Sequence, residues 1–220
     1  MDADWEAKAE AYIAGVFAAD SSGHDIWHSV RVYRTAMAIC GEEKGADKDI
    51  VGAAALLHDV DDRKIGGDPI GQPKARYFLG CVHATEDETE RILKVISEVP
   101  FKASGTLTPS TLEGKIVQDA DRLDAIGAIG IARAFAYGGA HGRMIYNPLA
   151  KVNDDPTEEE YLSGSPDTIS HFRQKLLKLK GMMNTEAGKR MAEHRHEVLE
   201  GFLEEFTAEW EGKRRGAKSL

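Results

Sequence analysis

The sequence predicts an all-α fold. Apolar residues recur every three or four positions along most of the 220 residues, as they do on the buried face of a helix. No segment alternates apolar and polar residues for long enough to count as a strand. Glycine- and proline-rich stretches separate the periodic segments, which is typical of loops between helices.

The first half of the chain contains five predicted helices. Ser21-Ser22-Gly23 ends the first of them, and Asp25 is expected to cap the second. A turn-rich loop, residues 66–73, follows the third helix. The five helices are predicted at about residues 5–17, 25–41, 47–59, 76–80 and 86–97.

The second half begins with one long predicted helix, residues 112–135, which follows a loop at 104–109. Residues 138–167 include Gly138-Gly139 and several prolines but few apolar residues, so we expect a long loop or lid. An amphipathic helix is predicted at 169–183, and Thr185 is expected to cap the last helix. We therefore predict a single domain over residues 1–220, with a core at about 20–137, the loop or lid at 138–167, and C-terminal helices at 168–212.

Composition narrows the classes of function. The chain carries 28 Lys and Arg against 37 Asp and Glu, a net charge of −9. This acidic balance argues against binding to nucleic-acid polymers, which need a basic stripe, but not against a small phosphorylated substrate. Residues 1–6 do not resemble a secretory signal, and no apolar run approaches the roughly 20 residues that span a bilayer. Because Cys40 and Cys81 are both expected to be buried free thiols, we predict a cytoplasmic protein. The lack of a spanning run predicts no membrane partner, and we leave a homodimer open.

A set of metal-binding residue types centres on His58-Asp59. This pair closes the apolar run Ala53–Leu57, where an imidazole and a carboxylate are costly to bury unless they are paired or bind a cation. His28 stands upstream in one predicted helix, and Asp121 stands downstream in another. The mixed nitrogen and oxygen set suits a borderline divalent ion such as manganese, iron, cobalt, nickel or zinc.

This ordered pattern resembles the HD-domain superfamily of metal-dependent phosphohydrolases, which is named for a histidine-aspartate pair flanked by an earlier histidine and a later aspartate. The matching segments are Trp27-His28, Leu56-Leu57-His58-Asp59 and Ala120-Asp121-Arg122-Leu123. The resemblance covers about residues 20–150. Residues 171–212 look like the C-terminal helices of a bacterial subgroup that is similar to small nucleotide pyrophosphohydrolases.

The resemblance implies an HD-type helical bundle with two additional C-terminal helices. It implies one bound divalent ion, manganese first, with magnesium, iron, cobalt, nickel or zinc as alternatives. The implied activity is hydrolysis of a small phosphorylated substrate, first of all a nucleoside triphosphate that is cleaved to monophosphate and pyrophosphate. A phosphomonoesterase, or a metal- or nucleotide-sensing module without turnover, stays open as the alternative.

Two acidic positions are ambiguous at this stage. Asp121 is assigned as the last ligand because Arg122-Leu123 follows it, as in the family, which places Asp119 behind the ligands or on the surface. Asp124 shares a helical face with Asp121 and is placed to orient a ligand histidine. A second pair, His24-Asp25, is not assigned as the central doublet because no apolar helix leads into it.

The residues that would act on the substrate are less clearly marked. Related HD hydrolases place a catalytic carboxylate where Asp62 stands, and Asp61 and Asp68 compete with it as the residue that positions water. Lys64, Arg31 and Arg122 are candidate phosphate contacts, and His24 is expected to line the pocket. His83 is expected to face solvent or to act as an extra ligand. Trp27 is expected in the core and not at the substrate, so we expect the protein not to discriminate strictly between the nucleobases of its substrates.

Overall fold

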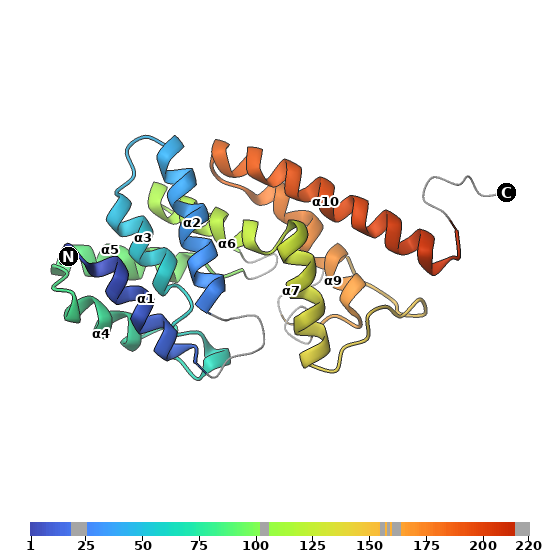
Figure 1. Ribbon diagram of the computed structural model, residues 1–220, viewed down its shortest axis with the longest axis horizontal. Coiled ribbons are helices and arrows are strands. Elements are labelled where there is room, and N and C mark those ends of the chain that lie inside the picture. The colour runs from blue at the N-terminus through green and yellow to red at the C-terminus, as the bar shows by residue number, and fades with distance from the viewer. Residues whose placement is uncertain (19–25, 102–105, 155–156, 158, 160–163, 214–220) are drawn as a thin grey trace.

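The computed structural model shows an elongated assembly of helices (Figure 1). It describes residues 1–18, 26–101, 106–154, 157, 159 and 164–213. Within these residues there are nine α-helices, two 3₁₀ helices and no strand beyond an isolated bridge between Met144 and Asp167. The prediction of an all-α fold is therefore confirmed.

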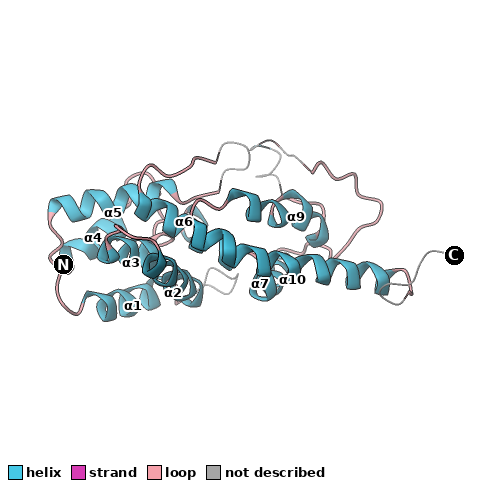
Figure 2. Cartoon of the chain, turned by 90° about the horizontal axis from the view of Figure 1, so that it is seen from above, coloured by secondary structure: helices cyan, strands magenta, loops and turns pink. Residues whose placement is uncertain are grey.

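The helices form two groups joined by α6. Figure 2 shows α1 to α5 gathered at the end that holds the N-terminus, with α7, α9 and α10 at the other end. The α-helices are α1 (Trp5–Val16), α2 (Ile26–Glu42), α3 (Lys48–Leu57), α4 (Pro73–Cys81), α5 (Glu86–Glu98), α6 (Leu112–Asp124), α7 (Gly127–Ala140), α9 (Thr168–Gln174) and α10 (Glu186–Trp210). The 3₁₀ helices are η1 (Arg63–Ile65) and η3 (Leu176–Met182).

Helix α3 is the centre of the N-terminal group. Asp47 caps its start by accepting hydrogen bonds from the backbone N–H groups of Asp49 and Ile50. All residues from Ile50 to Leu57 are buried, and a helix that is apolar on every side must be enclosed by its neighbours. Since α2, α5, α6 and α1 all pack against α3, the residues at its C-terminal end are carried into the interior.

The prediction of one long helix over residues 112–135 is wrong, because α6 ends at Asp124 and a separate helix, α7, begins at Gly127. Gly127 has a φ of +74°, which is unfavourable for residues with a Cβ atom. The apolar periodicity continues on both sides of the break, so the periodicity alone did not reveal it. The helix predicted at 169–183 is likewise divided, into α9 and the 3₁₀ helix η3.

Other boundaries and exposures also differ from expectation. Gly138 and Gly139 belong to α7 and not to the following loop. Cys40 is buried as predicted, but Cys81 is exposed, which corrects that expectation. Thr185 caps α10 as predicted, accepting a hydrogen bond from the Gly188 N–H. The expected cap of α2, Asp25, lies outside the described residues. No helix in the described part of the chain combines the length and apolar character needed to cross a membrane.

Candidate metal centre

Four predicted ligands converge between three helices. His28 projects from α2, His58 and Asp59 from the end of α3, and Asp121 from α6. The Nε2 atoms of His28 and His58 lie 3.2 Å apart. Asp59 Oδ2 lies 3.4 Å from each of these nitrogens. Asp121 Oδ1 lies 3.4 Å from His28 Nε2 and 3.8 Å from His58 Nε2.

These separations fit atoms that share one cation. Atoms bonded to the same ion at about 2.1 Å lie roughly 3.0–3.4 Å apart in tetrahedral or octahedral geometry. The ligand atoms of His28, His58 and Asp59 all lie within 4.8 Å of one another, so this cluster is consistent with a divalent metal site. Asp121 stands in reach of both imidazoles, but its place in the ligand set stays a prediction.

The end of α3 explains how two adjacent residues can face one point. The helix ends at Leu57, and His58 is the first residue beyond it. His58 Nδ1 lies 2.9 Å from the Ala55 carbonyl oxygen. Because a carbonyl only accepts, Nδ1 carries the proton and donates it, which leaves Nε2 as a lone-pair donor toward the cluster.

Asp124 holds His28 in the same way. Its Oδ2 atom lies 2.7 Å from His28 Nδ1, which is the position expected for a residue that orients a ligand histidine. The carboxylate also accepts from Arg31 Nε at 2.7 Å and from Arg133 Nη1 at 2.7 Å. Burial by itself would raise the pKa of Asp124, but the hydrogen bonds from His28 and Arg31 and the charge of Arg133 hold that pKa well below its usual range.

The charge balance of the cluster favours a cation. Burial by itself would lower the pKa of His28, because it penalises the charged imidazolium. Hydrogen bonds to Asp121, Asp124 and Asp59 outweigh this effect and raise the pKa of His28 to about 10. The carboxylates therefore stabilise positive charge at this point, whether it is a proton or a metal ion.

The three acidic candidates after the His-Asp pair occupy different environments. Asp61 is buried, and its two carboxylate oxygens accept from the backbone N–H groups of Lys74 and Ala75 at the start of α4. Asp61 therefore stabilises the fold and is a poor candidate for positioning water. Asp62 is partly buried in the turn after Asp59, whereas Asp68 is exposed and accepts from the Ile70 N–H.

The predicted substrate contacts are only partly visible. His24 and the side chain of Lys64 lie outside the described part. Arg31 lies at the cluster, paired with Asp124. Arg122 is 5% exposed and donates to the Met182 carbonyl, so it holds the C-terminal segment and is a weaker candidate for phosphate. His83 is exposed and pairs with Asp2, as expected for a residue that faces solvent.

Asp119 has a structural role that the sequence did not reveal. It is fully buried, not on the surface, and its carboxylate accepts from the backbone N–H groups of Asn184 and Thr185 and from the Thr185 hydroxyl. These contacts fix the start of α10 against α6. The expectation that Asp119 stands behind the ligands or on the surface is therefore corrected.

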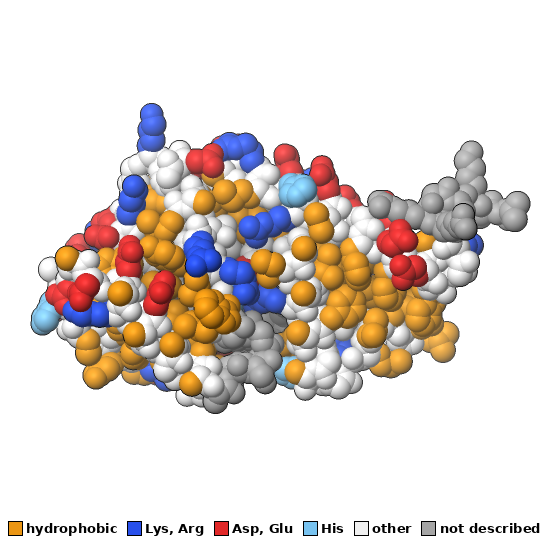
Figure 3. Space-filling view, in the orientation of Figure 1, with side chains coloured by type: hydrophobic (Ala, Val, Ile, Leu, Met, Phe, Trp, Pro, Cys, Tyr) orange, Lys and Arg blue, Asp and Glu red, His pale blue; other side chains and the backbone are white. Residues whose placement is uncertain are grey.

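Two arginines near the cluster were not foreseen. Arg133 of α7 pairs with Asp124, and Arg195 of α10 donates to the Leu123 carbonyl at the C-terminal end of α6. Figure 3 shows Lys and Arg side chains gathered where α2, α6 and α7 meet. Arg133 comes after the helix break, so no helical spacing relates it to Asp124. The sequence therefore carried no signal for this contact.

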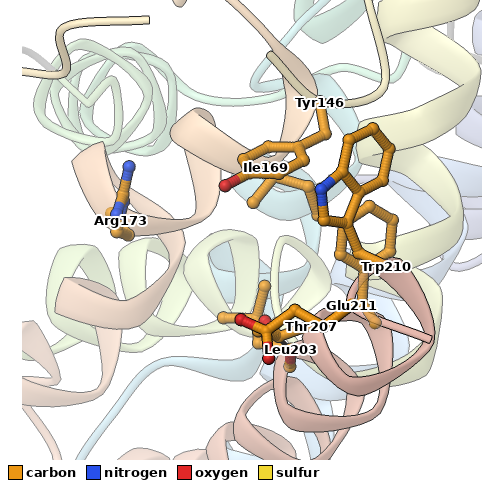
Figure 4. Close-up of a pocket in the computed structure, with 8 residues that line it drawn as sticks. Tyr146, Ile169, Arg173, Leu203, Thr207, Trp210 and Glu211 are labelled. Carbon is orange, nitrogen blue, oxygen red and sulfur yellow. Dashed lines mark hydrogen bonds between the residues drawn. The ribbon is translucent and has the colours of Figure 1, made fainter. Parts of the chain in front are cut away.

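A pocket lies between α9 and the C-terminal part of α10 (Figure 4). Its volume is about 210 Å³, and aromatic rings of Tyr146, Phe206 and Trp210 form much of its wall. The Tyr146 and Trp210 rings meet edge to face with their centroids 5.0 Å apart. Among the described residues that line it there is one carboxylate, Glu211, and no imidazole, so this pocket does not resemble the cluster at α3.

Comparisons with known proteins agree with this geometry. A model of the HD domain matches residues 26–126. Bacillus subtilis YpgQ, an uncharacterised protein, is 36% identical over 199 residues, which cover 89% of this chain and 88% of YpgQ.

Solved structures match along nearly the whole chain. A protein of Lactobacillus plantarum has a TM-score of 0.82 and 38% identity over 97% of this chain and all of its own. An HD-superfamily hydrolase of Bacillus thuringiensis has a TM-score of 0.73 and 39% identity over 94% of this chain and 97% of its own. The crystal structure of YpgQ in complex with ADP has a TM-score of 0.70 and 34% identity over 91% of this chain and 97% of its own.

Proposed function

Because this chain belongs to the HD domain superfamily of hydrolases, we propose that it is a metal-dependent phosphohydrolase that cleaves a nucleoside triphosphate to monophosphate and pyrophosphate. The observation that carries the proposal is the convergence of two imidazoles and two carboxylates on one point. The crystallisation of YpgQ with ADP supports a nucleotide as the ligand.

The metal would be held by His28, His58, Asp59 and Asp121. The pairing of each histidine Nδ1 with an acceptor leaves both Nε2 atoms for the ion, so the donor set fits one divalent cation. Manganese is the first choice because the resemblance to HD hydrolases implies it, and the imidazole and carboxylate donors are compatible with that ion as with other borderline divalent ions. Such an ion would polarise a phosphoryl group and lower the pKa of a water molecule.

Asp62 is the proposed water activator. It lies in the turn directly after the ligand Asp59, with its backbone N–H bonded to the Asp59 carbonyl at 3.0 Å. The side chain therefore starts close to the cluster. A carboxylate there can accept a proton from the attacking water, and Asp61 does not compete because backbone N–H groups occupy it.

Local cations have to offset the acidic character of the chain. The net charge of −9 repels a triphosphate at long range, so binding depends on the ion and on nearby guanidinium groups. Arg31 and Arg133 are the best candidates among the described residues, because both lie at the cluster and keep 27% and 22% of their side-chain surface exposed. Lys64 stays a candidate from the sequence.

The test is product analysis in ¹⁸O-labelled water. A nucleoside triphosphate is incubated with the protein and manganese, and the products are separated and weighed by mass spectrometry. Monophosphate and pyrophosphate, with the label in the monophosphate, are expected for attack at the α-phosphorus. The variant Asp59→Ala serves as the control for metal-dependent turnover.

Other products would replace this proposal with a neighbouring one. Diphosphate with labelled inorganic phosphate would mean that the terminal phosphate is removed. Hydrolysis restricted to monophosphates would indicate a phosphomonoesterase. Tight binding of metal and nucleotide without any cleavage would indicate a sensing module.

A further inference from the structure

Trp27 is a large aromatic residue turned toward solvent beside a buried metal ligand. Its surface is 60% exposed, whereas the next residues of α2, His28, Ser29 and Val30, are 2%, 0% and 5% exposed. The expectation that Trp27 belongs to the core is therefore wrong. An exposed indole presents a flat apolar face and a polar N–H edge, on which a planar ring of a ligand can stack.

The geometry of α2 places Trp27 on the same side as the cationic group at the cluster. Residues advance by about 100° around an α-helix, so Arg31 lies between Trp27 and His28 when the helix is viewed along its axis. Trp27 and Arg31 are also neighbours at a spacing of four residues. A ligand that extends from His28 along this side would meet Arg31 and then Trp27.

The orientation of this side of α2 is fixed. His28 Nδ1 and Arg31 Nε each lie 2.7 Å from an oxygen of the same buried carboxylate, Asp124 of α6. With both side chains held on α6, rotation of α2 that would bury Trp27 would break these bonds. The exposed position of the indole is therefore set by the contacts that build the metal cluster. Hydrophobic side chains adjoin Lys and Arg side chains over this region in Figure 3.

We propose that Trp27 is the platform on which the base of the nucleotide stacks while its phosphates lie at the metal cluster. This inference rests on the proposed function, since it concerns the same substrate. Stacking uses the flat face that every base has, so the site would accept all bases. Purines would bind better than pyrimidines because they overlap a larger area of the indole.

The decisive experiment compares a substrate that has a base with a ligand that lacks one. For Trp27→Ala, the KM for ATP should rise roughly 5- to 150-fold, the range for one lost base–aromatic stack. The inhibition constant of inorganic tripolyphosphate should stay the same, because it has no base. Trp27→Phe should restore most of the affinity for ATP, and the preference for ATP over CTP should shrink in Trp27→Ala.

Trp210→Ala is the matched control. Trp210 is 55% exposed and lies at the far end of α10, so loss of an exposed indole there should leave the KM for ATP unchanged (Figure 1). Equal loss of ATP and tripolyphosphate affinity in Trp27→Ala would overturn the platform. A change from dimer to monomer by light scattering would also overturn it, because it would assign Trp27 to contact with a second copy.

A binding measurement separates this inference from the proposed function. A non-hydrolysable ATP analogue with manganese should quench tryptophan emission in a Trp210→Phe background, and the quench should vanish when Trp27→Phe is added. Trp5, which is buried, remains in both proteins as an internal reference. If wild type cleaves no nucleotide but shows this quench, the hydrolase proposal fails and the platform stands. Binding of the analogue without a Trp27-dependent quench would contradict the platform.

Discussion

Replacing Asp124 by Asn tests whether the metal ligands depend on the buried carboxylate behind them. Asp124 is 2% exposed, and it accepts hydrogen bonds from His28, Arg31 and Arg133. Asn keeps the shape of the side chain but removes its charge. It also turns one acceptor into an N–H donor, which would face a donor of His28 or of an arginine.

The size of the effect follows from burial. Removing one partner of a buried ion pair costs about 3–5 kcal/mol, and we expect about 3 kcal/mol because Arg31 and Arg133 remain partly exposed. Loss of the hydrogen-bond acceptor of a ligand histidine weakens metal binding by about 10- to 100-fold. Both effects should therefore appear in one variant.

Two measurements on the Asp124→Asn variant check these values. Denaturation in guanidinium with a chelator present gives the free energy of unfolding without the metal contribution, and calorimetric titration with manganese gives the affinity. Glu42→Gln is the control, because it breaks the exposed pair of Glu42 with Arg190 and should cost at most about 1 kcal/mol. If Asp124→Asn unfolds at the wild-type midpoint and binds manganese with wild-type affinity, Asp124 does not support the cluster as argued.

Three further outcomes are expected. Elemental analysis should find about one divalent ion per chain in wild type and much less in Asp59→Ala; equal metal in the two would contradict the ligand set. Asp62→Asn should lower kcat by roughly two to four orders of magnitude with unchanged metal content, and a larger loss in Asp68→Asn would move the role of water activator to Asp68. With a chelator present, the contribution of His28 to the free energy of unfolding should be complete below its unfolded pKa of 6.5 and be lost as pH rises toward its folded pKa of about 10. The affinity for manganese should rise over the same pH range, because the ion displaces the proton of His28. Unfolding and calorimetric titrations across this pH range would check both trends, and a flat profile would contradict them.

The features that the sequence predicted are those that local pattern controls. The all-α fold follows from apolar periodicity, and the cluster of candidate ligands His28, His58 and Asp59 follows from residue type and order along the chain. The break between α6 and α7 was missed because it depends on a single positive-φ glycine inside a continuous apolar pattern. Side-chain exposure was also misjudged at Trp27 and Cys81, since it depends on how each helix is rotated against its neighbours.

The three aspartates of α6 show why the roles of identical residues need tertiary context. Asp121 and Asp124 are about 60° apart around the helix, so both face α2, where His28 lies at 3.4 Å from one and 2.7 Å from the other. Asp119 is about 160° from Asp121, and its side faces the start of α10.

Helix α6 therefore joins the two ends of the molecule through opposite faces. One face carries carboxylates that surround His28 at the candidate metal cluster, and the other carries a carboxylate that anchors the C-terminal helix. Arg195 of that anchored helix also donates a hydrogen bond to the Leu123 carbonyl at the end of α6. A shift of α10 would therefore move the end of α6, which carries the carboxylates of the metal cluster. Loss of the Asp119 contacts should thus change the geometry of the metal site, although Asp119 itself faces away from it.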